Sequence, residues 1–75
     1  MSKESFALLL SSKVQEICIK IVNYFGISYD EAIEKLYNSK LYEVLDNEES
    51  KMWYFSSYDL FKMFLEERET GEFTV

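Results

Sequence analysis

The sequence predicts an all-α fold, a small bundle of about four helices joined by short connections. Three observations lead to this prediction. The 75 residues contain no proline, and the only two glycines, Gly26 and Gly71, each follow a stretch with helical spacing. Apolar residues recur at steps of three or four along most of the chain, which is the period of an amphipathic helix. No repeat or low-complexity tract divides the sequence, so we expect a single domain over residues 1–75.

The first predicted helix covers residues 4–25. One apolar face follows from the spacing, and it consists of Phe6, Leu10, Val14, Ile17, Ile21 and Phe25. Cys18 falls within this face, where we expect an inert buried thiol. Leu8 and Ile19 lie on the flank of this face and Leu9 projects into the opposite polar face, which makes the apolar surface wider than one small core needs. The surplus predicts self-association into a homodimer, and the alternative is that other helices wrap around this helix and cover its flank.

Two short helices are expected next, over residues 29–37 and 40–45. Ser28 and Glu31 have the spacing of a capping box, in which each side chain bonds the other residue's backbone amide. Ser39 has the position of a second helix cap. The residues of these helices expected to face inward are Ile33, Leu36, Tyr37, Leu41, Val44 and Leu45.

The fourth predicted helix covers residues 57–69, with Ser56 as its cap. Its expected inner face is Tyr58, Leu60, Phe61, Phe64 and Leu65. The four large residues at 52–55 before it fit a strand, a helix start or a short extended connector, and we expect the connector. Trp53 and Phe55 are expected to fill the core, although Trp53 or Tyr54 could instead be an exposed interface anchor. Residues 72–75 are expected to form a loose tail.

The net charge is −6, and the acidic excess lies in the second half of the chain. Residues 1–42 contain five acids and five lysines, whereas residues 43–75 contain nine acids and three bases. Such a chain has no basic footprint for phosphate backbones, so we expect no nucleic acid partner. An anionic membrane surface would repel it as well. The acidic half either keeps the protein in solution or forms a surface for a basic protein partner.

The residue types needed for common active sites are missing. Without histidine the chain has no Cys–His or Ser–His nucleophile, and a single cysteine makes neither an intrachain disulfide nor a zinc site. No phosphate loop, calcium loop or dinucleotide fingerprint occurs. We therefore expect no enzyme, no cofactor, and no catalytic or metal-binding residue. No apolar run approaches a membrane span, and residues 6–10 are too short for a signal peptide, so we expect no membrane association and a cytoplasmic protein.

Residues 37–71 carry a pattern that resembles a group of short, uncharacterised bacterial proteins. The matching positions are Tyr37, Ser39, Tyr42 and Leu45, then Trp53 and Ser56, then Glu67, Glu69 and Gly71. The resemblance covers roughly half of the chain and transfers no site residue. Because some similar proteins are encoded beside toxin-like enzymes, it implies a bacterial protein with an accessory or antitoxin-like role.

These observations predict a non-enzymatic protein–protein interaction module that forms a homodimer. The candidate interface residues are Leu8, Leu9, Ile19, Trp53 and Tyr54. The alternative is a nucleic-acid-associated regulator that uses the helices at 29–37 and 40–45 as a helix-turn-helix. That reading requires lysines 13, 20, 35 and 40 to gather on one face, since residues 40–46 alone are too acidic to approach phosphates.

Overall fold

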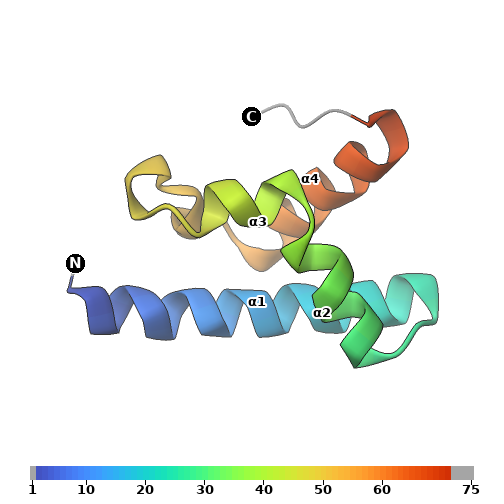
Figure 1. Ribbon diagram of the computed structural model, residues 1–75, viewed down its shortest axis with the longest axis horizontal. Coiled ribbons are helices and arrows are strands. Elements are labelled where there is room, and N and C mark those ends of the chain that lie inside the picture. Colours follow the sequence, from blue (N-terminus) through green and yellow to red (C-terminus); the bar gives the residue numbers. More distant parts are fainter. Residues whose placement is uncertain (1, 72–75) are drawn as a thin grey trace.

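The computed structural model describes residues 2–71 and is built from helices alone within that range (Figure 1). The α-helices are α1 (Lys3–Phe25), α2 (Tyr29–Tyr37), α3 (Lys40–Leu45) and α4 (Ser57–Thr70). Two 3-10 helices, η1 (Glu48–Ser50) and η2 (Met52–Tyr54), connect α3 to α4. The predicted all-α bundle is confirmed, and the tail predicted at 72–75 lies outside the described residues.

The long helix α1 forms one side of the molecule (Figure 1). In that view α3, the 3-10 turns and α4 lie above α1, and α2 crosses its C-terminal half. The elements in contact with α1 are α2, α4 and η2, while α3 contacts α2, α4 and both 3-10 turns. The opposite side of α1 therefore faces away from the rest of the bundle.

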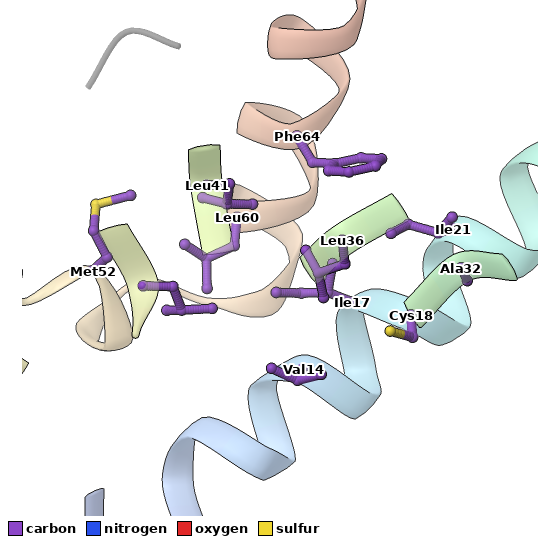
Figure 2. Close-up of a cluster of buried hydrophobic side chains, with 11 residues drawn as sticks. Val14, Ile17, Cys18, Ile21, Ala32, Leu36, Leu41, Met52, Leu60 and Phe64 are labelled. Carbon is purple, nitrogen blue, oxygen red and sulfur yellow. The ribbon is translucent and has the colours of Figure 1, made fainter. Parts of the chain in front are cut away.

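A single apolar core joins all four helices. Its buried members are Val14, Ile17, Cys18, Ile21, Ala32, Leu36, Leu41, Leu45, Met52, Leu60 and Phe64. Figure 2 shows Phe64 projecting from α4 toward Ile21 of α1. Burying one large aliphatic or aromatic side chain stabilises a fold by about 1.5–3 kcal/mol. This dense core is how a short chain without disulfides offsets the chain entropy lost on folding.

A serine side chain caps the N-terminus of each of the four α-helices. Each accepts a hydrogen bond from the backbone amide three residues later, with Ser2, Ser28, Ser39 and Ser56 as the caps. The N···O distances are 3.1 Å at Ser5 and 3.2 Å at the other three amides. Gly26 and Gly71 end α1 and α4 in the left-handed conformation, with φ of 67° and 78°. The predicted caps at Ser28, Ser39 and Ser56 are confirmed.

The connection before α4 differs from the predicted extended connector. Met52–Tyr54 form the 3-10 helix η2, and only Phe55, with φ −73° and ψ 154°, is extended. Side-chain hydrogen bonds hold this compact path: the Ser50 hydroxyl donates to the Val44 carbonyl at 2.7 Å and accepts from the Met52 amide at 3.3 Å. Lys51 adopts a left-handed φ of 60°, which turns the chain between η1 and η2.

Two tyrosines predicted to face the core lie on the surface instead, and Phe55, predicted to fill the core, is 37% exposed and lies outside it. Tyr37 is 51% exposed and Tyr58 is 59% exposed. Each is displaced around its helix from the nearest buried residue, because a helix turns about 100° per residue. Tyr37 follows buried Leu36 by one position, and Tyr58 precedes buried Leu60 by two.

Candidate protein interaction surfaces

The outer face of α1 carries two exposed aliphatic side chains. Leu8 is 74% exposed and Ile19 is 48% exposed. They stand eleven positions apart, close to three helical turns, which places them on one face about 16 Å apart along the axis. Exposed Ser12 and Gln15 lie between them on this face. We call these four residues the α1 outer face; the other helices do not cover it.

Leu9 was predicted to project into the polar face of this helix, and that prediction is wrong: it does not belong to the α1 outer face. It follows Leu8 by one residue, so it points about 100° further around the helix, and it is half-buried. The structure therefore brings together two of the three surplus apolar residues of α1.

Trp53 and Tyr54 are adjacent in sequence but differ in how far their side chains are exposed. The Trp53 indole Nε1 donates to the Glu48 carbonyl at 2.8 Å, and its ring meets the Phe6 ring edge-on at 6.5 Å. Trp53 is half-buried and packs against the core, which fixes it in place. Tyr54 is 80% exposed. Of these two candidate anchors, Tyr54 is the one whose side chain is available to a partner.

A groove between α1 and α4 was not foreseen from the sequence. It has a volume of about 320 Å³ and is lined by Lys20, Asn23 and Tyr24 of α1 and by Tyr58 and Phe61 of α4. The Tyr24 ring meets the Phe61 ring at 5.7 Å, and the Lys62 Nζ lies 5.6 Å from the centre of the Tyr58 ring. We call it the aromatic groove. The i, i+4 spacing of Lys20 and Tyr24 was its only local signal, because the groove forms where two distant helices meet.

A larger hollow of about 460 Å³ lies where α2, α3 and α4 meet. Its lining is mixed in charge and consists of Glu31, Glu34, Lys35, Asn38, Ser39, Phe64, Glu67 and Arg68. Four of these side chains are already engaged within the fold, since Ser39 caps α3 and Phe64 belongs to the core. The Glu67 carboxylate accepts from backbone amides of α3, and the Arg68 guanidinium lies 5.2 Å from the Phe25 ring centre and 5.8 Å from that of Phe64. The side chains of this hollow therefore serve the packing of α2, α3 and α4 against one another.

Two of the four lysines required by the helix-turn-helix hypothesis line different hollows. Lys20 belongs to the aromatic groove, whereas Lys35 belongs to the mixed hollow, beside the carboxylates of Glu31 and Glu34. Helix α3, the recognition helix of that hypothesis, is only six residues long and carries Glu43 as well as Lys40. No single basic face is built from these two lysines.

Cys18 is a buried free thiol in the core. Burial raises the pKa of this thiol above its ordinary value of 9.0, because the thiolate would lose its hydration. The thiol is therefore held in its protonated, unreactive form at neutral pH.

Within residues 2–71 no three histidine, cysteine, aspartate or glutamate side chains stand close enough to hold a metal ion. Over the same range no helix has the length and hydropathy to cross a membrane. Comparisons with family models, with curated proteins and with solved structures gave no match to this chain.

Proposed function

We propose that this protein is a non-enzymatic protein–protein interaction module that forms a homodimer through the α1 outer face. The observation that carries the proposal is the exposure of Leu8 and Ile19 on one face of a helix whose other face supplies the core. Burying an exposed leucine or isoleucine contributes about 1.5–3 kcal/mol, and a symmetric dimer buries each residue twice.

The spacing of the α1 outer face suits an antiparallel helix pair. The midpoint between Leu8 and Ile19 is also the midpoint between Ser12 and Gln15. A two-fold axis at that midpoint therefore sets Leu8 of one copy against Ile19 of the other, at both ends of the contact. The same axis sets Ser12 against Gln15, so the polar side chains of the seam also meet and can form hydrogen bonds across it.

A basic protein partner is the second part of the proposal. Exposed carboxylates are spread over the second half of the chain, at Glu43, Asp46, Glu49, Asp59, Glu66 and Glu69. Such a surface speeds the encounter with a basic protein. An accessory or antitoxin-like role in bacteria, which the resemblance implies, is consistent with this chemistry. Tyr54, which is 80% exposed and lies five residues from both Glu49 and Asp59, is the proposed aromatic anchor for that partner.

The test of the dimer is the solution mass of a Leu8→Glu/Ile19→Glu variant, measured by light scattering over a concentration range. The wild type is expected at twice the 9.0 kDa chain mass. The variant is expected at 9.0 kDa with unchanged helicity by circular dichroism, because both substitutions are on exposed positions. A Tyr37→Glu/Tyr54→Glu variant is the matched control, since it adds the same charge at exposed positions outside α1. A wild-type monomer, or a double variant of unchanged mass, would refute the dimer.

A further inference from the structure

The aromatic groove has no acidic residue in its lining, although the protein is acidic as a whole. Its lining offers three aromatic rings, one amide and one cation, and no carboxylate. We infer that this groove docks an acidic segment of another protein, held by one aromatic or branched aliphatic anchor side chain and by carboxylates beside it. The inference deepens the proposed function and rests on it in one respect, that the protein acts by binding another protein. It does not require the homodimer.

The apolar part of the groove is exposed and ordered by contacts between rings. Tyr24 is 64% exposed and Tyr58 is 59% exposed. The Tyr24 ring is nevertheless fixed by edge-on contacts with Phe25 at 4.8 Å and with Phe61 at 5.7 Å. Rigid, amphipathic tyrosines are favoured at the energetic centres of protein interfaces, because little conformational entropy is lost on contact. The space of about 320 Å³ is shallow and open to solvent, so it offers a surface for one side chain to lie against.

The positive charge of the groove favours a partner segment that carries negative charge. Lys20 is the one charged residue of the lining, and the ammonium of Lys62 lies over the Tyr58 ring at the rim. Glu16 stands one helical turn before Lys20 on the same side of α1, so the positive charge is limited to the groove itself, at Lys20 and at Lys62 on its rim. A carboxylate beside the anchor would therefore meet a cation, whereas a basic segment would be repelled.

The acids nearest to Lys62 along α4 face another hollow. Asp59 and Glu66 line a separate space of about 240 Å³ together with Phe55, Lys62 and Met63. Lys62 thus lies between the Tyr58 ring of the aromatic groove and the carboxylates of the second hollow. Lys20 consequently determines the selectivity of the aromatic groove more than Lys62 does.

Two other occupants fit the groove less well. If two copies paired groove to groove about a two-fold axis, Lys20 and Lys62 of one copy would lie near the same lysines of the other, which repel. A single nucleic acid strand could stack its bases on Tyr24 and Tyr58, but its phosphates extend well past the groove onto an acidic surface. A short acidic peptide segment gains the lysine contacts without that repulsion.

The experiment is a selection of random short peptides, displayed on phage, against the wild-type protein. Enriched peptides are then measured for binding to Lys20→Glu and Tyr58→Ala variants by fluorescence anisotropy. Lys3→Glu is the charge-matched control on α1, and Tyr37→Ala is a control at a tyrosine of similar exposure. Oligothymidylate is titrated in parallel as the probe for single-stranded nucleic acid.

We expect acidic peptides that contain an aromatic or branched aliphatic residue. Their binding should weaken by about tenfold or more in each groove variant, by little in either control, and with rising salt. Neutral or basic peptides, peptides that ignore both groove variants, or no enrichment at all would overturn the inference. Oligothymidylate that binds more tightly than the peptides and depends on Lys20 and Tyr58 would overturn it in favour of nucleic acid.

The same selection separates this inference from the proposed function. Peptides that bind the wild type and the groove variants equally, but lose binding in Leu8→Glu/Ile19→Glu, would leave an interaction module without a docking groove. Conversely, peptides that depend on Lys20 and still bind the Leu8→Glu/Ile19→Glu variant would support the groove even if the light-scattering test shows no dimer.

Discussion

The carboxylate of Glu67, near the end of α4, caps the start of α3 at Leu41. Its Oε1 accepts from the Leu41 amide at 3.1 Å, and its Oε2 accepts from the neighbouring Lys40 amide at 3.0 Å. The first amides of a helix have no partner within the helix, and a negative charge there also interacts favourably with the helix dipole. Ser39 caps the same helix locally through the Tyr42 amide. Two caps from different parts of the chain thus hold a helix of only six residues.

Removal of the Glu67 carboxylate should destabilise the protein. Glu67→Ala leaves both amides without their acceptor, and a lost charge-assisted hydrogen bond costs about 1.5–3 kcal/mol. Glu67→Gln keeps one neutral acceptor, so a smaller loss is expected. Urea unfolding followed by circular dichroism measures both. Glu66→Gln, at an exposed neighbouring position, is the control and should leave the midpoint unchanged. Equal midpoints for Glu67→Ala and wild type would mean that the cap contributes nothing.

Replacement of Trp53 by phenylalanine should test the indole hydrogen bond. The variant keeps an aromatic ring against Phe6 but loses the donor to the Glu48 carbonyl. We expect a loss of about 0.5–1.5 kcal/mol in the free energy of unfolding, measured by thermal and urea melts. Tyr54→Phe, which changes an exposed neighbour, should cost little. A Trp53→Phe variant as stable as the wild type would show that the bond to Glu48 is no better than one to water.

Lys51 is expected to be a site where glycine stabilises the fold. Its φ of 60° is unfavourable for a residue with a Cβ, by roughly 1–2 kcal/mol, and costs glycine almost nothing. The greater freedom of glycine in the unfolded chain offsets part of this gain, so Lys51→Gly should raise stability by less than about 1 kcal/mol. Gly26→Ala is the converse exchange: the space around Gly26 is open, yet its φ of 67° should make alanine destabilising. A Lys51→Gly variant that unfolds at lower urea than wild type would contradict this prediction.

Stability should fall in alkali partly through Cys18. Burial raises the pKa of the Cys18 thiol, so above pH 9.0, its ordinary value, the unfolded chain releases a proton that the native state retains. The stabilisation is complete below that pH and is lost as pH rises toward the native pKa. Burial also raises the pKa of Tyr42, with the charge of Asp46 adding to the shift, so loss continues above pH 10.0.

Urea midpoints of the wild type and Cys18→Ala, measured from neutral pH to above pH 10, test this prediction. The variant is less stable at neutral pH because it leaves a small cavity, but its decline between pH 9 and 10 should be shallower. In parallel, a thiol reagent should label Cys18 slowly in the native protein and rapidly in urea. Parallel pH curves for the two proteins, or fast native labelling, would contradict the buried, protonated thiol.

The sequence by itself determined the helices and most of their ends. Their apolar period and the serine caps act between residues at most four positions apart, so they could be read from the chain. It also identified Leu8 and Ile19 as surplus to the core face of α1. These features depend on residues close together in the chain, so they do not depend on how the helices pack.

Only the tertiary structure decided which flanks are covered and where distant residues meet. The exposure of Tyr37 and Tyr58, the capping of α3 by Glu67, and the aromatic groove between Tyr24 and Phe61 all depend on how α4 lies against α1 and α3. Glu67 and Leu41 are 26 residues apart in the chain, and no periodic pattern links them. A helix with apolar residues on more than one face can pack in several ways, and the contacts of the whole core select one of them.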